Sequence, residues 1–287
     1  MSIAYYNGEF DDFTNIKIPL TDRCVFFGDG IYDAAIGTDG VIYLEEEHLD
    51  RFFQNAKKLD MEIDLTKKKL SSLLHKVIEK NGYKQYFVYF QLTRSAPTRV
   101  HAYPKEAKTN LLITVNPHVF PNPEIPVSLI TREDIRYGMC DIKTLNLLPA
   151  VMASRAAEDA ECQEAVFIRE GIVTECAHSN VFIVKDGKIY THPESRYILP
   201  GITRKRVLML CENLGIPHAE EPFSYGDMTG ADEVLITSTT KLCLSADKVD
   251  GIAINSEKSD VGKRIISALR EDFWLCKNRR KRKLLKF

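Results

Sequence analysis

Four turns ending in glycine constrain the fold of this 287-residue chain most strongly. Each lies between short runs of branched and aromatic residues, and a dipeptide of this kind tolerates the positive φ angles of a tight hairpin turn. Each turn therefore predicts two antiparallel strands. The four are Asn7-Gly8 within 3–10, Asp39-Gly40 within 34–44, Glu170-Gly171 after 164–169, and Asp186-Gly187 after 180–184.

Helices are predicted between these hairpins. Apolar residues recur with a period of 3.6 over 49–59 and over 70–78, where Asn81-Gly82 ends the pattern. Further helices are expected at 149–161, 203–214 and around 265–273, the first opened by Pro149 and the second stopped by Gly215. The remaining strands are expected at 86–93, 110–115, 126–131 and 233–238. A mixture of hairpins and helices predicts an α+β protein.

Four prolines, at positions 117, 121, 123 and 126, mark a linker in the middle of the chain. We therefore expect two α+β domains. The predicted division is an N-terminal domain over 1–118, a linker and first strand over 119–133, a second domain over 134–276, and a basic tail over 277–287.

Composition excludes several classes of protein. No apolar run reaches the roughly 18 to 20 residues of a membrane helix, and the polar start of the sequence does not resemble a signal peptide. We expect a cytoplasmic protein without a membrane partner. Its seven cysteines are odd in number and lack CxxC spacing. They are interpreted as reduced thiols and as neither a disulfide framework nor a metal site.

The tail concentrates seven basic residues between Lys277 and Lys286, although the whole chain has a net charge of −1. An acidic body with a basic tail is one way to contact nucleic acid. Terminal charge runs usually remain solvated, so a nucleic-acid partner is not expected.

One lysine stands out chemically. Lys143 lies among apolar residues in the segment from Asp141 to Pro149, directly before a predicted helix. We expect it to be partly buried, and burial lowers the pKa of an amine. A desolvated lysine is a nucleophile for a carbonyl carbon.

The lysine segment is one of six segments that resemble the class IV aminotransferases, the fold-type IV pyridoxal 5'-phosphate enzymes. The resemblance runs from Tyr6 to about Phe273 and keeps the family's order. It implies the two-domain α+β fold of that family and its pyridoxal phosphate cofactor. The other five segments are Phe27–Tyr32, Glu47–Arg51, Thr174–Phe182, Leu199–Arg204 and Thr237–Thr240.

The resemblance assigns two catalytic residues. Lys143 is implied to form a Schiff base with the cofactor's aldehyde and to move the substrate's α-proton. Glu175 is implied to keep the pyridine nitrogen protonated, so that the ring can act as an electron sink.

The remaining cofactor contacts are assigned in the same way. Gly201 is implied to open a helix and to let its backbone approach the phosphate. The backbone N–H groups of Ile202 and Thr203 are then implied to bind the phosphate at this helix N-terminus. Arg51 is implied to donate hydrogen bonds to the phosphate from its guanidinium, and Thr239 is implied to donate one from its hydroxyl. Leu199 is implied to pack against the ring.

Substrate choice is interpreted from Arg99 and His101. On an extended strand these residues, two apart, would point to the same side and could clamp a carboxylate. With Tyr32, the pair is similar to the carboxylate trap of D-amino-acid aminotransferases, where it is implied to reach in from the neighbouring subunit of a homodimer. The resemblance implies ping-pong exchange between a D-amino acid, D-alanine being expected, and a 2-oxo acid, 2-oxoglutarate being expected.

The sequence departs from that group where small serines are usual, because Cys176, Ala177 and His178 follow Glu175. An imidazole there could change the side-chain preference. Cys140 could sense oxidation, but it is interpreted as a buried structural thiol. The alternatives are a branched-chain L-aminotransferase or aminodeoxychorismate lyase of the same fold, a nucleic-acid-binding protein acting through its tail, and a non-catalytic carrier of the cofactor.

Overall fold

The computed structural model describes residues 2–254 and 259–284, with side chains up to Cys276. It contains two compact units. The first comprises residues 1–119, 142–146 and 276–287, and the second comprises 120–141 and 147–275. The four-part division expected from the sequence stays a prediction, and the side chains of the basic tail lie outside the described residues.

The first unit is built on an antiparallel sheet with the strand order β2-β1-β6-β5-β3-β4. Asn7 and Gly8 have φ angles of 47° and 104°, and Asp39 and Gly40 have φ angles of 51° and 75°. These values confirm the two predicted turns of this unit. The strands are β1 (Ile3–Tyr6), β2 (Glu9–Asp12), β3 (Gly30–Thr38), β4 (Val41–Ile42), β5 (Gln85–Arg94) and β6 (Thr109–Pro117).

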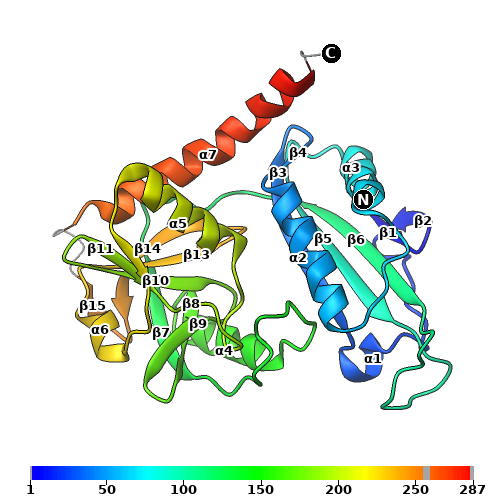
Figure 1. The fold of residues 1–287 in the computed structure, drawn as a ribbon, viewed down its shortest axis with the longest axis horizontal. Coiled ribbons are helices and arrows are strands. Elements are labelled where there is room, and N and C mark those ends of the chain that lie inside the picture. Colours follow the sequence, from blue (N-terminus) through cyan, green and yellow to red (C-terminus); the bar gives the residue numbers. More distant parts are fainter. Residues whose placement is uncertain (1, 255–258, 285–287) are drawn as a thin grey trace. The chain divides into compact units, whose positions relative to one another are not determined.

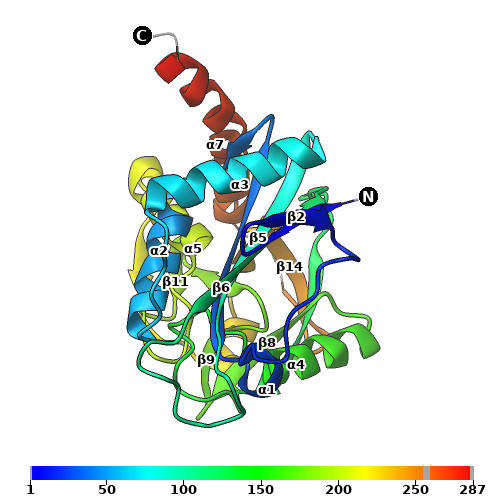
Figure 2. The ribbon, with the colours of Figure 1, turned by 90° about the vertical axis from the view of Figure 1, so that its right-hand side faces the viewer.

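Two helices pack on this sheet, α2 (Glu45–Lys58) against β3 and α3 (Lys67–Asn81) against β6, and Figure 2 shows them running at a steep angle to each other. Both were predicted, and α3 ends at Gly82 with a left-handed φ of 67°. Phe52 of α2 meets Phe90 of β5 edge to face, with ring centroids 4.8 Å apart. The core therefore lies between the two helices and the sheet. A short helix, α1 (Cys24–Phe27), precedes β3.

The second unit is built on a mixed sheet, ordered β12-β11-β10-β13-β14-β7-β8-β9, with β15 paired to β14 (Figure 1). Three of its pairings are parallel: β11 with β12, β14 with β7, and β7 with β8. Its strands are β7 (Val127–Glu133), β8 (Glu164–Arg169), β9 (Ile172–Cys176), β10 (Asn180–Lys185), β11 (Lys188–Thr191), β12 (His218–Glu220), β13 (Glu233–Ser238), β14 (Leu242–Val249) and β15 (Ile252–Ala253).

Helices cover this sheet: α4 (Leu148–Asp159) packs on β8 and β7, and α5 (Ile202–Leu214) packs on β13. The other helices are α6 (Tyr225–Thr229) and α7 (Val261–Leu284). The predicted Glu170-Gly171 and Asp186-Gly187 turns and the predicted stop at Gly215 are confirmed. None of the described helices is both long and apolar enough to cross a membrane.

One sequence expectation is wrong in its local structure. Arg99 and His101 lie in the loop between β5 and β6 and not on a strand. Pro97 explains the difference, because a residue without a backbone N–H cannot continue a strand ladder. The α+β class is confirmed.

Candidate active site

Backbone pairing to β3 holds Lys143 in place. The amide of Tyr32 donates to the Lys143 carbonyl at 2.9 Å, and the amide of Leu145 donates to the Gly30 carbonyl at 3.1 Å. A Cβ added to Gly30 would lie 2.6 Å from the backbone oxygen of Leu92 on β5 and 2.7 Å from the Leu145 side chain, so glycine lets both β5 and the lysine segment approach β3. The lysine segment is thereby fixed along one strand.

The Lys143 side chain extends over Tyr32. Its Nζ lies 4.2 Å from the ring centroid and donates to the phenolic oxygen at 3.1 Å. The lysine is half-buried, as the sequence predicted. Tyr32 in turn stacks on Tyr89 with ring centroids 5.3 Å apart. An aromatic surface thus orients the amine of this lysine.

A buried carboxylate behind the same strand anchors Arg51. Asp33 accepts from Nε and Nη2 of Arg51 at 2.8 and 2.9 Å, and it lies 2.8 Å from Nδ1 of His48. Burial would raise the pKa of Asp33, but Arg51 and His48 hold that pKa well below its usual range. Burial lowers the pKa of His48, and Asp33 opposes this only in part. Arg51 is therefore fixed by Asp33, and its expected contact with a phosphate stays a prediction.

The exposed loop carrying Arg99 and His101 is supported by Phe27. The Arg99 guanidinium lies 5.0 Å from the Phe27 ring centroid, and the His101 ring centroid lies 5.2 Å from it. Arg23 donates to the backbone carbonyl of His101 at 2.9 Å and to that of Val100. The two side chains therefore share one aromatic support although they do not belong to a strand.

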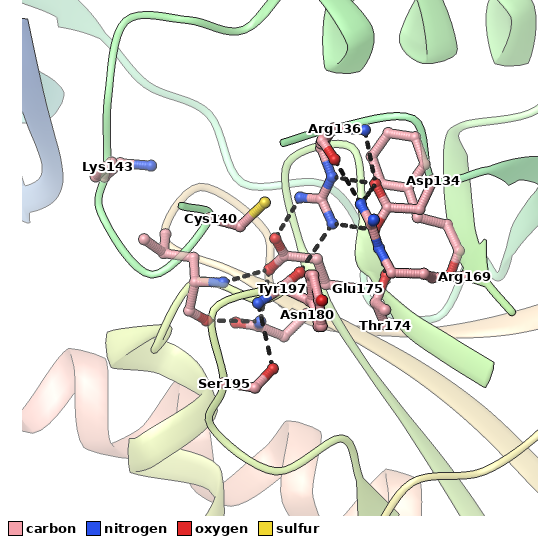
Figure 3. Close-up of polar contacts among 12 residues, drawn as sticks. Asp134, Arg136, Cys140, Lys143, Arg169, Thr174, Glu175, Asn180, Ser195 and Tyr197 are labelled. Atoms are coloured by element: carbon pink, nitrogen blue, oxygen red, sulfur yellow. Dashed lines mark hydrogen bonds and ion pairs between the residues drawn. The ribbon is translucent and has the colours of Figure 1, made fainter. Parts of the chain in front are cut away.

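In the second unit, Glu175 lies in a network of hydrogen bonds (Figure 3). Its Oε1 accepts from Nη1 of Arg136 at 2.5 Å. Its Oε2 accepts from the Asn180 side-chain amide at 3.1 Å and from the Leu199 backbone amide at 2.9 Å. Arg136 also donates to Asp134, at 2.9 and 3.0 Å. Such partners stabilise the charged form of the Glu175 carboxylate.

Asn180 links this carboxylate to the start of α5. Its amide donates to the Leu199 carbonyl at 3.0 Å, and its Oδ1 would lie 2.0 Å from a Cβ added to Gly201. A glycine is therefore required beside Asn180. Gly201 is the N-cap of α5 and, as a glycine, has no side chain with which to cap the first N–H groups of the helix.

The N-terminus of α5 suits an anion. The first N–H groups of a helix lack partners within the helix, so those of Ile202 and Thr203 remain available, and the helix dipole favours negative charge there. Thr239 is half-buried and follows β13, whose Thr237 pairs with Asn180. Thr203 and Asn180 are buried.

Each of these groups fits one part of pyridoxal phosphate. Lys143 offers an oriented amine for an aldehyde, Glu175 offers a charged carboxylate for a pyridinium nitrogen, and the start of α5 offers backbone donors for a phosphate. The first group belongs to one unit and the other two belong to the second unit.

Sequence reasoning missed Arg136, Asp134, Asp33 and His48. Arg136, Asp134 and Arg169 form a network in which Arg169 lies 3.1 Å from an Asp134 oxygen. The only available signal was a charge inside an apolar run, as for Asp33 between Tyr32 and Ala34. A buried charge needs a partner, although the sequence alone does not name it.

The family model for amino-transferase class IV matches residues 30–249 of the chain. A D-alanine aminotransferase of Staphylococcus epidermidis is 37% identical over 254 residues, which cover 88% of this chain and 90% of that protein. A D-alanine aminotransferase of Bacillus licheniformis is 36% identical over 257 residues, which cover 88% and 89%.

Solved structures show the same fold. A branched-chain aminotransferase of Thermoproteus uzoniensis, solved with norvaline, superimposes with a TM-score of 0.87 at 21% identity and with 94% of each chain covered. The branched-chain amino acid aminotransferase of Escherichia coli superimposes with a TM-score of 0.86 at 23% identity, again with 94% of each chain covered.

Proposed function

The chain belongs to amino-transferase class IV, and on that premise we propose that it is a D-amino-acid aminotransferase that uses pyridoxal 5'-phosphate. It exchanges an amino group between a D-amino acid and a 2-oxo acid, with D-alanine and 2-oxoglutarate as the expected pair. The observation that carries the reaction is the Lys143 amine held 3.1 Å from the Tyr32 hydroxyl. The D-alanine aminotransferases at 36–37% identity support the substrate class.

Lys143 is proposed to perform two steps. When bound, the cofactor supplies an aldehyde for the substrate's amine and a ring that accepts electrons from the α-carbon. Lys143 would hold the cofactor through its Nζ. When its amine is free, Nζ would take the substrate's α-proton and would give a proton back in the reverse direction. Tyr32 keeps Nζ on the aromatic surface during both transfers.

Glu175 is proposed to hold a proton on the ring nitrogen. It can do so only while it is ionised, and the cation of Arg136 together with the amides of Asn180 and Leu199 favours that form. Gly201, Ile202 and Thr203 are proposed to bind the phosphate, with Arg51 and Thr239 as further donors, and Leu199 to pack on the ring.

Arg99 and His101, with Tyr32, are proposed to bind the substrate's α-carboxylate. Both are exposed on a loop whose backbone is tied to Arg23. A guanidinium is well suited to a carboxylate because it donates two parallel hydrogen bonds. If the bound carboxylate buries the Arg99 guanidinium, Arg99→Ala should weaken binding of the amino acid by roughly 2 to 5 kcal/mol. An equal loss for an amine without a carboxylate would contradict this role.

We also propose a homodimer in the cytoplasm. Each unit exposes large apolar side chains, a feature that marks interaction sites. In the first unit these include Val25 and Phe26 of α1, and in the second they include Leu148, Val151 and Met152 of α4. The seven cysteines form no disulfide in the part of the chain that the structure describes, which suits a reducing compartment. Light scattering of the purified protein tests the dimer.

The test of the function is a single-turnover experiment. Cofactor-loaded protein is mixed separately with D-alanine, L-alanine and L-leucine, and the absorbance of the bound cofactor is followed together with release of the oxo acid. Conversion by D-alanine alone supports the proposal. Conversion by L-leucine would move the chain to branched-chain L-aminotransferases, and no conversion by any amino acid would favour a cofactor carrier.

A further inference from the structure

A buried glutamate that has no role in the proposed reaction holds two basic side chains together. The carboxylate of Glu164, at the start of β8, is fully buried. One of its oxygens lies 2.8 Å from Nδ1 of His178, and the other accepts from Nζ of Lys241 and from the Ser179 hydroxyl, each at 2.8 Å. Burial would raise the pKa of Glu164, but His178 and Lys241 hold that pKa below its usual range.

His178 and Lys241 also contact each other, because Nζ of Lys241 lies 3.2 Å from Nε2 of His178. Because Nε2 faces the ammonium of Lys241, the neutral imidazole accepts through Nε2 and carries its hydrogen on Nδ1, on the side of Glu164. In that state the cluster of Glu164, His178 and Lys241 has no net charge. A second anion near Nε2 would favour a proton on His178 and would bind two positive groups above one buried negative group.

The chain places this cluster beside the groups proposed to hold the cofactor. His178 lies between Glu175 and Asn180 in sequence, and Lys241 follows Thr239 by two residues. The strands that lead into these two loops are neighbours, since Asn180 of β10 pairs with Thr237 of β13. The cluster therefore lies at the same end of the sheet as Glu175.

Exposure distinguishes the three side chains. The side chain of His178 is 51% exposed, that of Lys241 is 16% exposed, and that of Glu164 is 0% exposed. The imidazole can therefore meet a solute while the buried carboxylate fixes its position. A simple buried ion pair would not leave its imidazole half open to solvent.

We propose that His178 and Lys241 form a binding subsite for the second carboxylate of a dicarboxylic substrate, such as D-glutamate or 2-oxoglutarate. The inference rests on the proposed aminotransferase function, in which Arg99, His101 and Tyr32 bind the α-carboxylate. His178 stands where small serines are usual in D-amino-acid aminotransferases, and in the proposed subsite it helps to select the substrate's side chain. It also explains why a lysine lies in the loop after β13.

The subsite predicts that dicarboxylate binding takes up a proton. The titratable groups facing His178 are Glu164 from β8 and Lys241 from the loop after β13. Cys176 on β9 stays neutral because burial raises its pKa well above the ordinary value, and Glu175 is paired with Arg136. The proton taken up with the dicarboxylate is therefore assigned to His178.

The direct test compares two inhibitors of equal chain length, glutarate and pentanoate, by calorimetry on the cofactor-loaded protein. They differ by a carboxylate in place of a methyl group. We expect wild type to bind glutarate at least about tenfold more tightly, since a hydrogen bond to a charged group contributes about 1.5 to 3 kcal/mol and 1.4 kcal/mol is tenfold. His178→Gln and Lys241→Gln should each reduce this preference, and titrations in two buffers should show proton uptake in wild type but not in His178→Gln.

Lys185→Gln is the matched control, because Lys185 is an exposed lysine at the far end of β10. It should keep the full glutarate preference. Equal binding of glutarate and pentanoate by wild type, or a preference that survives in both variants, would overturn the subsite. Thermal melting of each variant separates loss of fold from loss of the subsite.

Kinetics separate this inference from the proposed function. In the two variants kcat/KM should fall roughly tenfold for D-glutamate and change little for D-alanine. Equal losses for both substrates would make the cluster a support for the Glu175 loop and contradict the subsite. Turnover of D-alanine without glutarate preference contradicts only the subsite. Glutarate preference without any D-alanine conversion contradicts only the aminotransferase proposal.

Discussion

Asp33 in the first unit and Glu175 in the second are both buried carboxylates that accept hydrogen bonds from an arginine, yet they are held differently. Asp33 is 0% exposed and engages two nitrogens of Arg51, with His48 beside it. Glu175 is 7% exposed, and it shares its arginine, Arg136, with Asp134. Its other oxygen meets two neutral N–H donors.

This difference separates a structural anchor from a reactive group. A carboxylate that binds one arginine bidentately mainly fixes that arginine, here Arg51. A carboxylate whose arginine is shared keeps more of its negative potential for another partner. We therefore expect loss of charge at Asp33 to reduce stability most, and loss of charge at Glu175 to reduce activity most.

The largest effect is expected for Asp33→Asn. This change leaves the Arg51 charge buried without its counter-charge, and breaking a buried ion pair costs about 3 to 5 kcal/mol. The free energy of unfolding, measured by denaturant titration with and without cofactor, should fall by that amount. A loss below about 1 kcal/mol would remove the distinction between the two carboxylates.

Glu175→Gln should reduce activity more than it reduces stability. Removing one preorganised charge from the reaction should slow single turnover of D-alanine by about 10² to 10³. The free energy of unfolding should fall by only about 1 to 3 kcal/mol, because Arg136 keeps its ion pair with Asp134. Retained cofactor with a slow reaction is the expected combination. An unchanged rate would exclude Glu175 from the chemistry.

The pH dependence of stability reports on the anchor around Asp33. Burial lowers the pKa of His48 from 6.5, so as the pH falls below about 6.5 the unfolded chain binds a proton that the folded protein does not. The free energy of unfolding should therefore decrease with falling pH in this range. His48→Asn should reduce the slope. Some slope remains from His192, whose pKa burial also lowers. A slope identical to that of wild type would contradict this assignment.

The smallest expected effect is on the alkylation rate of Cys140, which reports the charge of Glu175. Burial raises the pKa of Cys140 to about 11, and the Glu175 charge contributes in the same direction while Arg136 opposes it. Since the thiolate is the reactive form, alkylation of Cys140 should be slow in wild type and faster in Glu175→Gln. Cys162, whose pKa is raised by burial and by Asp250, is the internal control and should not change. Mass spectrometry of the alkylated peptides measures both rates. A Cys140 rate unaffected by the variant would mean that Glu175 does not carry its charge.

The sequence predicted what is decided locally. Turns at Asn7-Gly8 and Glu170-Gly171 and the end of α3 at Gly82 depend on φ angles that a few residues specify. The strand β14 was missed, because its residues Leu242–Val249 include charged and small side chains and lack a clear alternation. Arg99 and His101 were placed on a strand because their spacing was read without the effect of Pro97.

Contacts between residues far apart in the chain could not be predicted from the sequence. Lys143 was recognised from its apolar neighbours, yet its Tyr32 contact depends on pairing across more than one hundred residues. Arg136 resembles any surface arginine until folding brings it to Glu175. The roles of Lys143, Glu175 and the phosphate-binding residues therefore rest on the motif resemblance and stay predictions, with geometry that fits each of them.

Borohydride reduction of the cofactor-loaded protein, followed by peptide mapping, shows whether Lys143 is the residue that holds the cofactor. Reduction fixes the cofactor to the amine that carries it. We expect a single modified peptide containing Lys143, which D-alanine added beforehand should abolish and L-alanine should leave in place. A cofactor fixed to any other lysine, or unaffected by D-alanine, would contradict it.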